Sequence, residues 1–83
     1  MKVLKFYADW CQPCKMLSKT IADLGDQITL QIEEVDIDSD PDLAVKYGVR
    51  GVPTMVKVDD SGAEVGRLVG MVAGTKVIEF MGA

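Results

Sequence analysis

The stretch from Val3 to Leu17 reads VLKFYADWCQPCKML, and it predicts the first strand, the first helix and the chemistry between them. Residues Val3–Ala8 are β-prone and apolar apart from Lys5, which is typical of a buried strand in the centre of a sheet. Beyond the first cysteine, apolar side chains recur at three- and four-residue spacing and therefore share one helical face: Cys14, Leu17, Ile21 and Leu24. We expect a helix that begins near Cys11 and stops at Gly25.

Cys11 and Cys14 are the only cysteines, and the sequence has no histidine. A structural disulfide across so short a loop would contribute only about 2 kcal/mol by the chain-entropy formula, so a stapling role is a poor explanation. A zinc site normally needs four ligands, and this chain would have to add carboxylates or a second chain. A dithiol that exchanges electrons with another disulfide explains the pair better, and a reducing cytosol tolerates such a catalytic pair.

The composition predicts one small domain over residues 1–83. The chain has 83 residues, 48% hydrophobic and 27% charged, with a net charge of −4. Its nine lysines and arginines are scattered, so we expect no nucleic-acid partner. The longest apolar runs are short and Lys5 interrupts the first of them, so we expect a cytoplasmic protein without a membrane segment. Nothing in the sequence indicates a dimer surface, and a monomer is expected.

The remainder of the chain predicts three more strands and two more helices. Asp40 and Pro41 are typical of a helix start, and Gly48 of a helix end. The expected strands are Ile28–Ile37, Val52–Val58 and Glu64–Val69, and the last helix is Thr75–Met81. The order is βαβαββα, which predicts an α/β fold with a four-stranded mixed sheet covered by three helices.

The position of the cysteines assigns them different roles. Cys11 lies at a strand-to-helix junction, where unpaired amides and the helix dipole stabilise a thiolate, so it is the expected nucleophile. Cys14 lies one turn deeper and is expected to resolve the mixed disulfide that Cys11 forms. Trp10 would provide an exposed apolar contact, and Pro13 would restrict the loop.

Residues 8–16, ADWCQPCKM, resemble the active-site segment of the thioredoxin family. Three other segments agree with the family in order and near-spacing: Val35–Asp38, Lys46–Thr54 and Val69–Gly70. The resemblance implies a thioredoxin-like fold and a protein-disulfide reductase without a bound cofactor. It also implies disulfide-containing protein substrates and a separate thioredoxin reductase as partners.

The resemblance also implies a substrate cleft. Pro53 matches the family's cis-proline, whose missing N–H lets a substrate backbone approach the sulfur atoms. An apolar rim that holds an extended substrate segment is matched by Trp10, Gly51, Val52, Gly70 and Met71. The alternative interpretation makes the two glycines turn residues only and Val52 a core residue.

The sequence departs from the family in two informative ways. The family usually begins with an extra strand and helix, whereas here Met1 leads almost directly into the first strand. Lys5 occupies the position of a buried aspartate beneath the second cysteine, and Glu34 that of its lysine partner. Both signs are inverted, which predicts a swapped ion pair, because one unpaired buried charge would cost several kcal/mol. The alternative is that Lys5 extends to solvent and Glu34 is simply exposed.

A swapped pair would change the acid–base chemistry of the thiols. Neutral Lys5 could deprotonate Cys14, or Glu34 could act through water, and both are therefore candidate catalytic residues. A positive Lys5 would favour thiolates and make the protein a stronger oxidant than a typical thioredoxin.

Two other functions remain open at the sequence level. A glutaredoxin-like protein reduced by glutathione would share the CxxC and proline loop, although residues 70–74 do not match the segment that grips glutathione. A dimeric module that holds a metal or an iron–sulfur cluster between two chains would also use two cysteines per chain.

Overall fold

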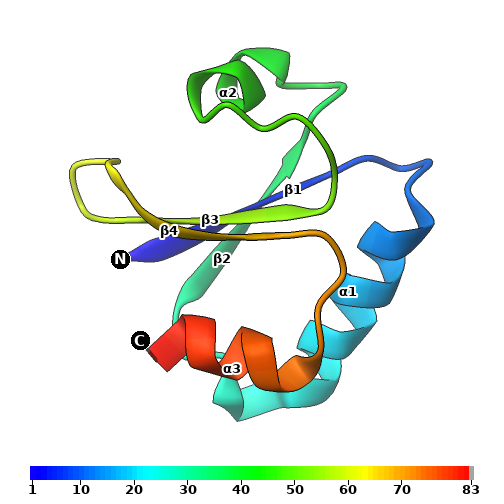
Figure 1. Ribbon diagram of the computed structural model, residues 1–83, viewed down its shortest axis with the longest axis vertical. Helices are drawn as coiled ribbons and strands as arrows, with labels where there is room; N and C mark the ends of the chain where they lie inside the picture. The colour runs from blue at the N-terminus through cyan, green and yellow to red at the C-terminus, as the bar shows by residue number, and fades with distance from the viewer. Residues whose placement is uncertain (83) are drawn as a thin grey trace.

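The computed structural model describes residues 1–82, which form one sheet with helices on both of its faces (Figure 1). The strands are β1 (Lys2–Tyr7), β2 (Gln31–Asp36), β3 (Thr54–Val58) and β4 (Glu64–Val69). The helices are α1 (Gln12–Leu24), the short 3-10 helix η1 (Gly25–Gln27), α2 (Pro41–Lys46) and α3 (Gly74–Gly82). The expected βαβαββα order is confirmed, with η1 as a one-turn addition after α1. Within the described residues, no helix is long and apolar enough to cross a membrane.

The strand order in the sheet is β2-β1-β3-β4. β1 pairs with β2 in parallel, whereas β1 with β3 and β3 with β4 are antiparallel. The sheet is therefore mixed, as expected, and β1 lies in its interior. Because β1 and β2 run in the same direction, the residues that follow both strands meet at one edge of the sheet.

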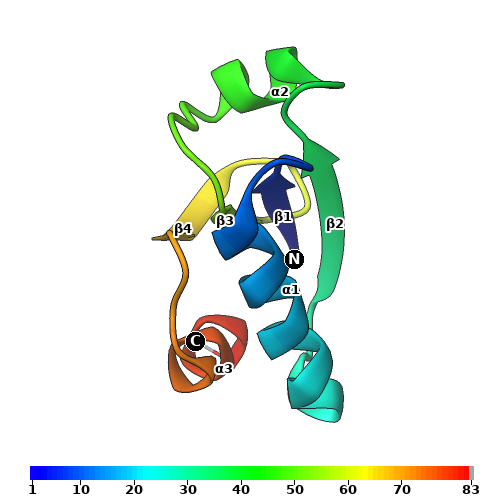
Figure 2. The same ribbon diagram turned by 90° about the vertical axis from the view of Figure 1, so that its right-hand side faces the viewer.

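The two faces of the sheet carry separate apolar cores. Figures 1 and 2 show α2 over one face and α1 with α3 over the other. The core beneath α2 contains Leu4, Phe6, Val35, Ala44, Val56 and Val58. The core beneath α1 and α3 contains Val3, Leu17, Met55, Val77, Phe80 and Met81. The three apolar residues predicted for the last helix, Val77, Phe80 and Met81, are all buried.

Strand alternation decides where Lys5 points. Successive side chains of a strand face opposite sides of the sheet, so Lys5 shares its face with Val3 and turns toward α1. Its side chain is only 2% exposed, so it does not extend to solvent. The lysine that interrupts the apolar run in the sequence is thus part of the buried strand.

Two strands begin later than the sequence predicts. β2 begins at Gln31 rather than Ile28, because Ile28 is the C-cap of η1 and donates its N–H to the Gly25 carbonyl at 3.1 Å. β3 begins at Thr54 rather than Val52, because Pro53 has no N–H to donate to a neighbouring strand.

Candidate active site

The two cysteines form a disulfide at the start of α1, with Cα atoms 5.3 Å apart. Cys11 is the N-cap of the helix, and its Sγ accepts the N–H of Cys14 at 3.2 Å. Pro13 lies in the first turn, where its missing N–H removes no helical hydrogen bond. The backbone thus places the Cys11 sulfur against a helix amide, as the junction in the sequence predicted.

The charges around the helix start favour an anionic sulfur. The first turn of α1 contains no acidic residue, and the positive end of the helix dipole lies there. Hydrogen bonding to the charged form of a group favours that form, so the Cys14 N–H stabilises a Cys11 thiolate over a thiol. Both sulfur atoms are buried in the disulfide form, with Cys11 4% and Cys14 2% exposed.

The disulfide packs on the loop before β3. Val52 contacts the small cluster formed by Ala8, Cys11 and Cys14. The Val52–Pro53 peptide bond is cis, and the Pro53 carbonyl accepts the Gly70 N–H at 2.8 Å. This hydrogen bond brings the loop after β4 next to the loop before β3.

The five residues expected at the rim differ in exposure. Trp10 is 69% exposed and Met71 38% exposed. Gly51 is exposed, whereas Val52 and Gly70 are half-buried. Gly70 also has a φ of 85°, which favours glycine, so it serves as a turn residue whatever else it does.

Trp10 has a partner that the sequence analysis did not identify. Its indole N–H donates to Asp38 Oδ2 at 3.1 Å. Trp10 follows β1 and Asp38 follows β2, and the ends of two neighbouring parallel strands lie together. The strand prediction alone would have placed the two residues at the same edge of the sheet.

Lys5 forms the inverted ion pair with Glu34. Its Nζ lies 2.8 Å from Glu34 Oε1, and the two residues are Cα partners in the β1–β2 register. The lysine side chain is buried, but that of Glu34 is 59% exposed. Only the lysine of the pair is therefore buried. The sequence analysis offered a buried ion pair or two solvent-exposed side chains, and the structure combines a buried Lys5 with a largely exposed Glu34.

Lys5 Nζ also donates to Ser18 Oγ on α1, at 2.5 Å, and lies 5.8 Å from the centre of the Tyr7 ring. Sequence analysis did not identify Ser18, although it follows Cys14 by four residues and so lies on the same side of α1. The ammonium thus links β1, β2 and α1.

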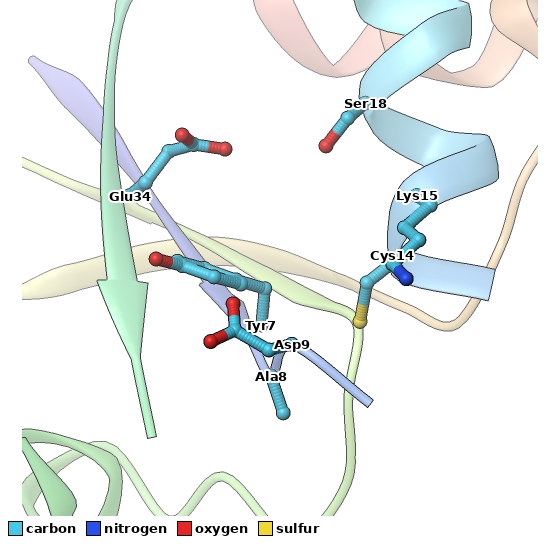
Figure 3. Close-up of a pocket in the computed structure, with 7 residues that line it drawn as sticks. All are labelled: Tyr7, Ala8, Asp9, Cys14, Lys15, Ser18 and Glu34. Atoms are coloured by element: carbon cyan, nitrogen blue, oxygen red, sulfur yellow. The ribbon is translucent and has the colours of Figure 1, made fainter. Parts of the chain in front are cut away.

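A pocket of about 300 Å³ opens beside Cys14. It is lined by Tyr7, Ala8, Asp9, Cys14, Lys15, Ser18 and Glu34. Figure 3 shows the Glu34 carboxylate and the Ser18 hydroxyl pointing toward each other from β2 and α1, with the Cys14 sulfur in the same pocket.

Burial raises the pKa of the Tyr7 hydroxyl, and the negative charges of Asp36, Asp9 and Glu34 raise it further. Tyr7 therefore remains protonated at neutral pH.

The described part of the chain contains no group of three or more histidine, cysteine or acidic side chains placed to hold a metal ion. Cys11 and Cys14 are joined to each other. The geometry of residues 1–82 is that of a redox pair at a helix start, next to a polar pocket.

Comparison with known proteins agrees with this geometry. The family model described as Thioredoxin matches residues 1–83. The SPbeta prophage-derived thioredoxin-like protein YosR of Bacillus subtilis is 39% identical over 70 residues, which cover 84% of this chain and 82% of that protein. Thioredoxin of Chlamydia caviae is 40% identical over 70 residues, which cover 83% of this chain and 68% of that protein.

Solved structures show the same relationship. A mutant thioredoxin from Halobacterium salinarum NRC-1 superimposes with a TM-score of 0.84 at 38% identity, covering 95% of this chain and 69% of that one. Thioredoxin of Fasciola hepatica superimposes with a TM-score of 0.82 at 35% identity, covering 95% and 75% of the two chains.

Proposed function

The chain belongs to the thioredoxin family and is a thiol-disulfide oxidoreductase, and on that basis we propose that Cys11 is its nucleophile and Cys14 its resolving thiol. The observation that carries the assignment is the hydrogen bond from the Cys14 N–H to Cys11 Sγ at the helix start. It stabilises an anion on Cys11.

The reaction has two exchange steps. The Cys11 thiolate attacks one sulfur of a substrate disulfide, forms a mixed disulfide and releases the other substrate sulfur as a thiolate. The Cys14 thiolate then attacks Cys11 Sγ and releases the second substrate thiolate. Two electrons pass to the substrate, whose thiolates take up protons, and the Cys11–Cys14 disulfide seen in the structure remains.

Lys5 and Glu34 tune the two thiols in this proposal. The ammonium of Lys5 is buried on the α1 side of the sheet, and a nearby positive charge favours thiolates and thereby the reduced form. Glu34 partly cancels that charge and connects it to solvent through its exposed carboxylate. The Lys5 ammonium cannot accept a proton, so Cys14 is deprotonated through water held by the Glu34 carboxylate.

The substrate lies along the loops around the disulfide. Pro53 presents no N–H, so a substrate backbone can approach without burying an unpaired donor. Trp10 and Met71 offer exposed apolar surface, and Gly51, Val52 and Gly70 lie in the loops before β3 and after β4. An extended, disulfide-containing segment of a protein is the substrate that such a rim fits.

The family and the composition support a proposal for the cellular location, the oligomeric state and the reductase partner. We propose that the protein acts in the cytoplasm as a monomeric single domain. A separate thioredoxin reductase returns the disulfide to the dithiol. Thioredoxin relatives support this over reduction by glutathione.

The test is reduction of a disulfide-bonded protein such as insulin with dithiothreitol as electron donor. The wild type should accelerate the reaction, and Cys11→Ser should abolish the acceleration. Ser39→Ala, at an exposed position in the turn after β2, is the control and should retain it. Full activity of Cys11→Ser would overturn the proposal.

A further inference from the structure

The ammonium of Lys5 is held by groups from three elements. It donates to Glu34 on β2 and to Ser18 on α1, and it lies over the Tyr7 ring on β1. An ammonium has three donors and a four-carbon flexible stem, so its position depends on these contacts. A buried ammonium that loses one acceptor must turn toward the remaining one or toward water.

Ser18 is the contact that draws this charge toward the cysteines. Glu34 lies on the edge strand β2 and is 59% exposed, whereas Ser18 lies on α1, one turn after Cys14. Both side chains line the pocket beside that cysteine. Without the serine hydroxyl, Glu34 and solvent would be the polar partners left to the ammonium. The ammonium would then lose its hydrogen bond to α1, the helix that begins at the cysteines.

We propose that Ser18 is a positioning residue for the redox reaction, because its hydroxyl holds the Lys5 ammonium against α1, one turn after Cys14. This role rests on the proposed function, since it acts through the same thiol pair. The serine contacts neither substrate nor the reacting sulfur in this role, and it sets how strongly Lys5 stabilises the thiolates.

The other charges around the pocket do not substitute for Lys5. Asp9 and Glu34 are anionic and oppose a thiolate, and Tyr7 stays neutral because its pKa is raised. Lys15 is the one cation among the described residues that line this pocket, and it is exposed. Solvent weakens the effect of an exposed charge, so a buried ammonium has the larger effect per charge.

The experiment measures the oxidised-to-reduced equilibrium of the protein in glutathione redox buffers, followed by Trp10 fluorescence. Ser18→Ala should increase the oxidised-to-reduced ratio about fivefold at fixed poise, a shift of about −20 mV at 29.6 mV per tenfold change. Ser18→Thr keeps the hydroxyl and should restore the wild-type ratio. Ser39→Ala removes a hydroxyl elsewhere and should not change it.

A double-mutant cycle with Lys5→Met isolates the mechanism. If Ser18 acts through Lys5, Ser18→Ala should have no further effect on the equilibrium once Lys5 is replaced. An equal effect in both backgrounds, or none in the wild-type background, would overturn the proposal. If Lys5→Met does not fold, the difference in oxidised-to-reduced ratio between Ser18→Ala and Ser18→Thr tests the proposal without it. If only the role of Ser18 is wrong, the wild type still reduces insulin. If the proposed function is wrong, the wild type does not reduce insulin.

Discussion

Lys5 and Glu34 form an ion pair across two neighbouring parallel strands, with one partner buried and the other 59% exposed. The pair thus carries a desolvated positive charge into the space beneath α1, while its negative charge remains partly screened by water. A symmetrical surface pair would have little effect on a nearby thiol. From this asymmetry we expect the two residues to have opposite and separable effects on the redox equilibrium.

Replacing Lys5 with methionine should make the protein a stronger reductant. The change removes the buried cation but keeps an apolar chain of similar length, so the thiolates lose electrostatic support and the disulfide gains relative stability. We expect the equilibrium with glutathione to change about tenfold, or ~30 mV to lower potential. Lys19→Met, which removes an exposed lysine of α1, is the matched control. An unchanged potential in Lys5→Met would contradict the electrostatic role.

Replacing Glu34 with glutamine should shift the potential the other way. The Lys5 charge is then less compensated, so thiolates are favoured more strongly and the protein becomes a stronger oxidant. Because a buried ammonium loses its counter-charge, the free energy of unfolding should fall by about 1–2 kcal/mol. Glu33→Gln, on the opposite face of β2, breaks only an exposed pair with Lys2. Urea titration should show little change for that variant, and equal losses for the two would contradict the account.

Part of this site was predictable from the sequence and part was not. The resemblance pointed to Lys5 and Glu34 as a pair. The burial of only one partner was not predictable, because it depends on how α1 covers β1 while leaving the edge strand β2 open. Ser18 was missed because a serine on a helix has no distinctive pattern, and only its distance to a buried ammonium reveals it.

The sequence predicted the helices and strands better than it predicted the connections between them. Spacing of apolar residues predicted α1 and α3, and the Asp40–Pro41 pair predicted the start of α2. The start of β2 was set too early, because Ile28 and Leu30 continue an alternating pattern although the backbone there forms a 3-10 turn and its exit. Side-chain alternation alone does not distinguish a paired strand from an apolar connection that packs against the same core.

Truncation of Leu17 tests the core beneath α1. This side chain is fully buried between α1, the sheet and α3, so Leu17→Ala should lower the free energy of unfolding by about 2–5 kcal/mol. Its neighbour Met16 is 58% exposed, and Met16→Ala should change stability by no more than about 0.5 kcal/mol. Urea denaturation measures both. Similar losses in the two variants would show that Leu17 does not lie on the buried face of α1.

Asp59 should give the β3–β4 turn a dependence on pH. The Ser61 hydroxyl, then the backbone N–H groups of the turn, lower the pKa of Asp59 below its ordinary value of 3.8. A lowered folded pKa contributes stability that is present above the ordinary value and is lost as pH falls through the folded pKa. Asp59→Asn should therefore be less stable than the wild type at neutral pH, and the difference should shrink in acid. A difference in urea midpoint that stays constant between neutral pH and pH of about 2 would refute this assignment.

The central claim is that Cys11 attacks and Cys14 resolves, and trapping the mixed disulfide tests it most directly. Cys14→Ser cannot complete the second exchange, so it should accumulate a covalent adduct with a disulfide-containing protein substrate, and mass spectrometry should locate that adduct on Cys11. Cys11→Ser should give little adduct under the same conditions. Stable adducts on Cys14 of Cys11→Ser, with none on Cys11 of Cys14→Ser, would reverse the roles and contradict the account.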